Sequence, residues 1–146
     1  MTSRPLVLDT NVVLDVFLFD DAAARPILPL LEQGALHWVS TPPMRNELER
    51  VLAYAQIQAK LGFYSLTAAD VLAGFDRHAH MLEVAPKARF TCTDGDDQKF
   101  IDLAVAHRAL LLSKDAAVLK LRKRLATLDV TVAKVLPALS YELSAT

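Results

Sequence analysis

Acidic residues recur along this chain in contexts that suit metal-dependent chemistry. Asp9 ends the first apolar run, Asp115 follows a later one, Glu47 lies between them, and three aspartates fall within residues 94–97. Carboxylates gathered at one point repel one another unless a cation compensates their charge. A site built from oxygen ligands alone favours Mg²⁺ or Mn²⁺ over Zn²⁺. Such a metal would neutralise a phosphate group, acidify a bound water and orient its attack on phosphorus.

Short apolar runs alternate along the chain with stretches of helical periodicity. Strands are predicted at residues 5–8, 36–39, 81–84, 109–112 and 130–132. Helices are predicted after Asp9, over residues 22–33, from Pro42 to Ala55, after Thr67, from Asp96 or Asp97, over residues 116–125 and over residues 134–143. Strands that alternate with helices predict an α/β fold, with three α/β/α layers around a central, mostly parallel, Rossmann-like sheet.

The predicted topology brings the acids toward one edge of the sheet. Ligands of parallel sheets bind at the carboxyl ends of the strands, where Asp9 and Asp115 both project. The aspartates of residues 94–97 start the helix that precedes the later strand, and Glu47 lies near the margin of the apolar face of its helix. Each acid also has a purely structural interpretation. Asp9 and either Asp96 or Asp97 could be helix N-caps, Asp115 a turn residue and Glu47 a solvent-facing side chain.

Length and composition bound the class of protein. One domain spanning residues 1–146 is expected, because the chain has no repeat and no flexible linker. A hydrophobic content of 53% excludes a disordered chain. The longest uncharged stretch, residues 33–44, is too short to cross a membrane, and no secretory signal is recognisable. The single cysteine, Cys92, cannot form an internal disulfide, so we expect a cytoplasmic protein.

Charge is unevenly distributed on a nearly neutral chain. There are 16 Lys and Arg against 17 Asp and Glu, a net charge of −1, which by itself does not indicate a polyanion partner. Residues 120–124 nevertheless hold four positive charges, and residues 94–97 hold three negative ones. The basic run is either ordinary solvated surface or a local contact for nucleic acid.

Four segments together resemble successive motifs of the PIN-domain nucleases, in the order of that family and over essentially the whole chain. They are LVLDTNVVL at residues 6–14, ELERVL at 47–52, CTDGDDQKFI at 92–101 and LLSKD at 111–115. The resemblance is strongest to the bacterial branch described as toxin components of toxin–antitoxin systems. It implies a compact PIN-like α/β/α domain that binds Mg²⁺ or Mn²⁺ and hydrolyses RNA.

The resemblance also implies roles for individual residues. It matches the catalytic acids of the family at Asp9, Glu47, Asp97 and Asp115, of which Asp9, Asp97 and Asp115 would bind the metal. It also matches polar residues that brace the first ligand at Thr10 and Asn11, and a small hydroxyl at Ser113. Asp94 matches a further acid of this branch, so either Asp94 or Asp97 is the direct metal ligand. The chain departs from the family at Ala117, where relatives often carry another acid, and this departure would weaken a second metal site.

The function that the resemblance implies is that of a metal-dependent endoribonuclease, the toxin of a toxin–antitoxin pair. RNA would be the substrate, a small antitoxin a partner, and the assembly a homodimer that uses the apolar helix at residues 22–31. Side chains that follow Ser113 in the chain are candidates for contacting nucleic acid: Lys114, Lys120, Arg122, Lys123 and Arg124.

Two other functions are compatible with parts of the sequence. A PIN-like module that binds nucleic acid or protein, with weak or no catalysis, is favoured by the near-neutral net charge. The start of the chain is also similar to that of haloacid-dehalogenase-type phosphatases, but Asn11 stands where those enzymes need a second aspartate as general acid. The nuclease and the binding module therefore remain the two alternatives.

Overall fold

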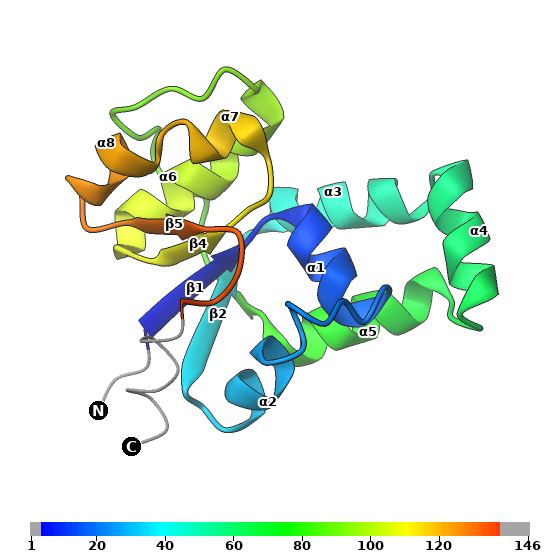
Figure 1. The fold of residues 1–146 in the computed structure, drawn as a ribbon. Coiled ribbons are helices and arrows are strands. Elements are labelled where there is room, and N and C mark those ends of the chain that lie inside the picture. The colour runs from blue at the N-terminus through cyan, green and yellow to red at the C-terminus, as the bar shows by residue number, and fades with distance from the viewer. Residues whose placement is uncertain (1–3, 138–146) are drawn as a thin grey trace.

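A computed structural model describes residues 4–137 as a five-stranded parallel sheet flanked by helices (Figure 1). The strands are β1 Arg4–Leu8, β2 Leu36–Ser40, β3 His80–Met81, β4 Leu110–Leu112 and β5 Thr131–Ala133. Their order across the sheet is β3-β2-β1-β4-β5, and each neighbouring pair runs parallel. This order confirms the predicted α/β fold and places the carboxyl ends of β1 and β4 next to each other.

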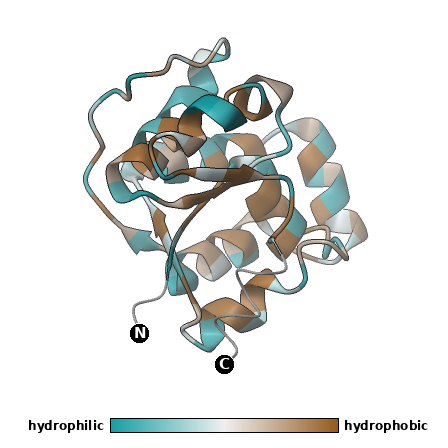
Figure 2. Ribbon diagram, turned by 60° about the vertical axis from the view of Figure 1, so that its left-hand side comes forward, coloured by the Kyte–Doolittle hydropathy of each residue, from teal (hydrophilic) through white to brown (hydrophobic). Residues whose placement is uncertain are grey.

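Helices cover both faces of the sheet. The face that carries Leu6, Leu8 and Trp38 packs against α1 Thr10–Phe17, α2 Ile27–Glu32, α3 Pro42–Leu52, α4 Ala55–Phe63 and α5 Ala68–His78. The face that carries Val7 and Leu111 packs against α6 Gln98–His107, α7 Ala116–Leu119 and α8 Arg122–Ala126, and the short 3-10 helix η1 Gly95–Asp97 precedes α6. Figures 1 and 2 show the two helical layers on either side of largely hydrophobic strands. Because both faces are covered, β4 and the second half of β1 are continuous buried apolar runs.

The register between β1 and β4 determines which residues meet at the edge of the sheet. Leu8 pairs with Leu112, and the backbone N–H of Asp9 donates to the carbonyl of Leu112 at 3.0 Å. The next residues of the two strands, Asp9 and Ser113, therefore leave the sheet side by side.

The helix predicted over residues 22–33 is shorter than expected. Residues 22–26 form turns, and α2 begins only at Ile27. Proline has no backbone N–H, so a helix through the whole segment would lose hydrogen bonds at Pro26 and Pro29. Beginning at Ile27 removes this problem, because Pro29 then lies in the first turn, where its N–H is not needed.

The same segment is partly buried in the chain itself. Ala24, Ile27 and Leu30 belong to the hydrophobic core, whereas Ala22, Ala23, Pro26 and Pro29 are exposed. The buried side chains stabilise the fold, and self-association through the exposed ones stays a prediction.

Other predicted boundaries were also wrong. The helix from Pro42 ends at Leu52, and Ala55 instead begins α4, which the sequence did not reveal. The helix predicted over residues 116–125 is two short helices, α7 and α8, because the chain leaves the helical path at Leu121, where φ is −90° and ψ is 1°.

The structure also differs from the prediction at residues 81–84 and at Lys134. The strand predicted at 81–84 is the two-residue β3, because β2 ends at Ser40, whose carbonyl accepts the N–H of Leu82 at 2.8 Å and leaves no further partner. The final helix does not begin at Lys134, since residues 134–137 are irregular, and residues 138–143 lie outside the described part of the chain. Within residues 4–137, no helix has the length and apolar character to span a membrane.

Gly62 and Gly74 both lie inside helices but differ in the space around them. A Cβ on Gly74 would come within 2.7 Å of the Phe17 ring, which stacks on Trp38, whereas a Cβ on Gly62 would meet nothing within 4 Å. We expect Gly74→Ala to lower the free energy of unfolding by about 1–3 kcal/mol, because a packed ring must move. Gly62→Ala should raise it by up to about 1 kcal/mol, because alanine favours the helix. Urea unfolding measures both, and changes of the same sign would contradict the packing described here.

Candidate metal centre

Asp9 is held at the carboxyl end of β1 by neighbours from two strands. It is 4% exposed and caps α1, with the N–H of Asn11 donating to Oδ1 at 3.4 Å. The hydroxyl of Ser113, which follows β4, donates to Oδ2 at 2.7 Å. Burial raises the pKa of Asp9 above its ordinary value, and the bond from Ser113 opposes this effect. Asp9 is therefore both a helix cap and a fixed carboxylate at the edge where the sequence predicted a site.

Three more aspartates converge beside it. Asp94, Asp97 and Asp115 each have a carboxylate oxygen within 4.8 Å of the others. Asp94 caps η1 by accepting the N–H of Asp96 at 3.0 Å, and Asp115 caps α7 by accepting the N–H of Ala117 at 2.8 Å. The loop before α6 and the end of β4 thus deliver acids to one place, as their spacing predicted.

Asp97 differs from the other three aspartates. It occupies the N-cap position of α6 without making a side-chain cap bond, and its Oδ2 atom is buried with no hydrogen-bond partner in the described structure. Burial raises the pKa of Asp97 to about 7, with the charges of Asp9 and Asp115 adding to the effect. A buried carboxylate oxygen without a donor, surrounded by other acids, is the environment that a bound divalent cation would stabilise.

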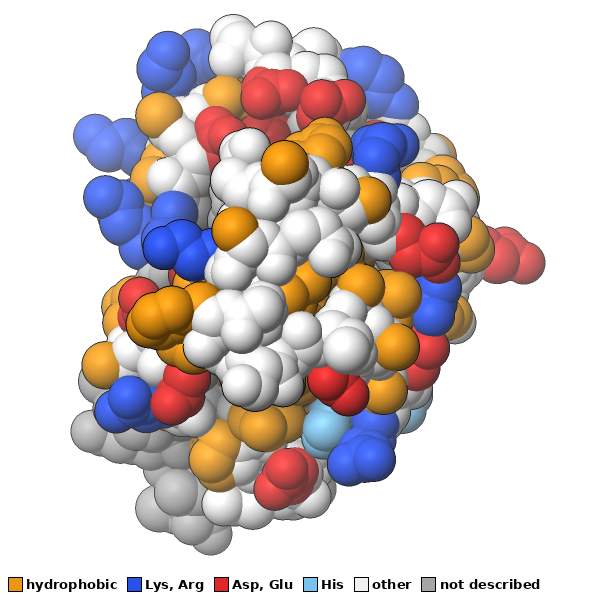
Figure 3. Space-filling model, turned by 90° about the vertical axis from the view of Figure 1, so that its right-hand side faces the viewer, with side chains coloured by type: hydrophobic (Ala, Val, Ile, Leu, Met, Phe, Trp, Pro, Cys, Tyr) orange, Lys and Arg blue, Asp and Glu red, His pale blue; other side chains and the backbone are white. Residues whose placement is uncertain are grey.

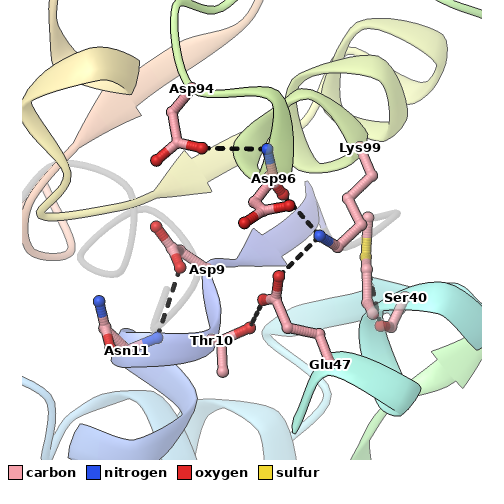
Figure 4. A network of polar contacts seen from close by, with 9 residues as sticks. Asp9, Thr10, Asn11, Ser40, Glu47, Asp94, Asp96 and Lys99 are labelled. Carbon is pink, nitrogen blue, oxygen red and sulfur yellow. Dashed lines mark hydrogen bonds and ion pairs between the residues drawn. The ribbon is translucent and has the colours of Figure 1, made fainter. Parts of the chain in front are cut away.

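Glu47 belongs to a separate contact at the same edge. It extends from α3 with its side chain only 12% exposed. The hydroxyl of Thr10 donates to Oε2, and the ammonium of Lys99 donates to Oε1 at 2.7 Å (Figure 4). Both oxygens of Glu47 therefore accept hydrogen bonds from the chain itself, which shows that Glu47 is not a solvent-facing helical glutamate.

Lys99 was missed by reasoning from the sequence. Its ammonium also donates to the backbone carbonyl of Asp96 at 2.5 Å, so it ties α6 to the preceding 3-10 turn and to α3. The only local signal was a basic residue two positions after an acidic run. That signal does not identify a partner such as Glu47, which lies 52 positions away in the sequence.

The bracing residues act differently from one another. Ser113 bonds the Asp9 carboxylate directly and also accepts the N–H of Asp115 at 3.1 Å, so it links two of the acids. Thr10 braces Glu47 and not Asp9. Asn11 contributes its backbone N–H, while the residue itself is exposed.

The basic residues lie beside the acids. Figure 3 shows a group of acidic side chains with Lys and Arg side chains on both sides of it. A hollow of about 370 Å³ runs between the loop before Asp94 and the helices after Asp115; it is lined by Thr91, Thr93, Ala117, Lys120, Leu121, Lys123 and Arg124. Arg122 lines a neighbouring hollow with Lys120, Lys123 and Lys134. Lys114 is paired with Asp15 at 2.5 Å.

Comparisons with known proteins identify the fold and the family of the chain. A chain in the crystal structure of VapBC2 from Rickettsia felis, bound to a DNA fragment from their promoter, is similar in fold, with a TM-score of 0.61 over 88% of this chain and 97% of that chain. The two sequences are 14% identical, so the likeness concerns the fold. Comparison with curated proteins gave no match. The family model described as PIN domain matches residues 5–117, from β1 into α7 and across every acid of the site. This chain belongs to the PIN domain family.

Proposed function

We propose that this protein is a Mg²⁺- or Mn²⁺-dependent endoribonuclease and the toxin of a toxin–antitoxin pair. The observation that carries the proposal is the buried, unpartnered Oδ2 of Asp97 among the carboxylates of Asp9, Asp94 and Asp115. PIN domains are generally nucleases, and the stretch that matches the family model includes Asp9, Asp94, Asp97 and Asp115. The four aspartates fit a hard divalent cation because all of their ligand atoms are oxygens.

Asp94, Asp97 and Asp115 would hold the metal, with Asp9 beside them. When bound, the metal would neutralise the charge of the phosphate and lower the pKa of a water molecule. The chain supplies orientation: Oδ1 of Asp94 and Oδ1 of Asp115 are each fixed by a backbone N–H, and Asp9 is fixed by Ser113. Carboxylates held in this way need little rearrangement when the reaction begins. Both Asp94 and Asp97 are proposed as ligands, since their oxygens lie in the same cluster.

RNA is the proposed substrate because a basic surface adjoins the acids. Lys120, Lys123 and Arg124 line the hollow that begins next to Asp94 and Asp115, and positive side chains in such a groove attract a phosphate backbone. The similarity to VapBC2 supports a small antitoxin as partner. We also propose a homodimer and a cytoplasmic location, as expected for a toxin that meets its antitoxin and RNA inside the cell. The near-neutral net charge favours the alternative of a PIN-like binding module without useful catalysis, and cleavage assays separate the two.

The nuclease proposal predicts metal-dependent cleavage of pooled single-stranded RNA. Wild-type protein should cut with Mg²⁺ or Mn²⁺ and not with EDTA. Asp9→Asn and Asp97→Asn should each lower the rate by more than about 100-fold, since losing even an outer partner of a metal ligand lowers activity roughly 10- to 100-fold. Gel analysis of end-labelled RNA measures the rates.

Asp129→Asn is the matched control for these two variants. Asp129 is exposed and precedes β5, so it lies at the opposite edge of the sheet, and its left-handed φ of 63° suits asparagine. Its substitution removes one negative charge and should leave cleavage unchanged. Silence of the wild type with every metal, or cleavage that survives both site substitutions, would overturn the catalytic assignment in favour of a binding module.

The raised pKa of Asp97 predicts how metal-free stability depends on pH. The folded protein holds this proton up to about pH 7, whereas the unfolded chain releases it near the ordinary value of 3.8. Stability therefore falls as pH rises between these values, because the folded state binds more protons. In EDTA at pH 8, Asp97→Asn should raise the free energy of unfolding by about 2 kcal/mol, and near pH 4 the gain should disappear.

Thermal and urea unfolding at several pH values measure this effect. Adding Mn²⁺ should stabilise the wild type strongly and the Asp97→Asn variant weakly, because ligands of the folded state shift unfolding by mass action. A variant that is less stable than the wild type at pH 8 in EDTA would contradict the description of Asp97 as an uncompensated buried acid.

A further inference from the structure

The acids at the edge of the sheet fall into two groups. The groups differ in whether a Lys or Arg of the chain forms an ion pair with them. Among residues 4–137, no ion pair joins a Lys or Arg to Asp9, Asp94, Asp97 or Asp115, whereas Glu47 is paired with Lys99 at 2.7 Å. The charge of the aspartate group must therefore be compensated from outside the chain. The charge of Glu47 is compensated from within it.

Lys99 is held in place by several contacts. Its ammonium donates to Glu47 Oε1 and, at 2.5 Å, to the carbonyl of Asp96, and it lies 5.0 Å from the centre of the Phe100 ring. Its side chain is 23% exposed. Two oxygen acceptors and an aromatic face provide a built position for a monovalent cation, and the ammonium occupies it.

Each carboxylate oxygen of Glu47 already accepts a hydrogen bond from the chain in this arrangement. Thr10 donates to Oε2 and Lys99 to Oε1 (Figure 4). A divalent ion that used Glu47 as a ligand would have to displace the ammonium or lie directly beside it, where like charges repel. No side-chain ligand is available from Ala117, which contributes only its N–H to Asp115.

We propose that Lys99 is a built-in cation that takes the place of a second metal ion, so that each chain binds one divalent ion, on the aspartate group. The proposal rests on the proposed function, because it concerns the metal of that same site. Lys99 is a positioning residue: it acts through Glu47, which it fixes and neutralises. Glu47 then contributes to the site as a fixed carboxylate of α3 and not as a metal ligand.

Counting bound Mn²⁺ tests the proposal without any substrate. Equilibrium dialysis, with free Mn²⁺ measured by electron paramagnetic resonance, gives the number of ions per chain up to millimolar concentrations. The wild type should bind one. Lys99→Met preserves side-chain length and removes the charge, so Glu47 is left without a cation, and the count should rise to two.

Two further variants identify the cause of that change. Lys99→Arg keeps a positive charge beside Glu47 and should still bind one ion. The double variant Lys99→Met with Glu47→Gln removes both charges and should return the count from two to one. Circular dichroism before each titration establishes that the variants are folded, and the wild-type count alone remains decisive if Lys99→Met does not fold.

The outcomes separate this inference from the proposed function. A wild type that binds no Mn²⁺ would refute the metal-dependent nuclease and the inference with it. A wild type that binds two ions would refute the inference alone and leave the nuclease intact. A folded Lys99→Met variant that still binds one ion would likewise show that Lys99 does not stand in for a second metal.

Discussion

Repulsion among carboxylates at the carboxyl edge of the sheet is the constraint to which the rest of the site responds. Segments from across the chain, the ends of β1 and β4, helix α3 and the turn before α6, each bring an acid to this edge. Hydrogen bonds and one ion pair relieve part of the repulsion, most directly where Ser113 bonds Asp9 and Lys99 pairs with Glu47. The buried Oδ2 atom of Asp97 has no hydrogen-bond partner among the described residues, and the pKa of Asp97 is raised. The fold has thus assembled a group of carboxylates whose charge the described residues do not fully compensate.

Three acids of the proposed metal site also have a structural role. Asp9, Asp94 and Asp115 each cap a helix or a 3-10 turn with one carboxylate oxygen. A cap bond fixes the direction of the side chain, so capping orients the acid for a second role. Asp97 is the exception, since it stands at an N-cap position without making the bond. Asp97 therefore has no capping role that would explain its burial, and metal binding is the role that we propose for it.

The basic side chains around the site fall into two groups, those that pair with acids of the chain and those that line a hollow beside the site. Lys99 and Lys114 are committed to ion pairs with Glu47 and Asp15, whereas Lys120, Lys123 and Arg124 line a hollow beside the acids. Such a local arrangement allows a chain of net charge −1 to present a positive surface to a polyanion. Net charge alone therefore does not exclude a polyanion partner.

The sequence by itself determined the fold class, the strand positions near residues 5–8, 36–39 and 109–112, and the edge at which the acids gather, because apolar periodicity and parallel topology depend on local patterns. The sequence pattern did not predict where helices are interrupted, at Pro26 before α2 and at Leu121 between α7 and α8. Tertiary structure alone decided that Lys99 meets Glu47 and that Asp97 has no partner. These facts depend on how α3 and α6 pack on the sheet, and contacts between residues far apart in the chain leave no periodic signal in it.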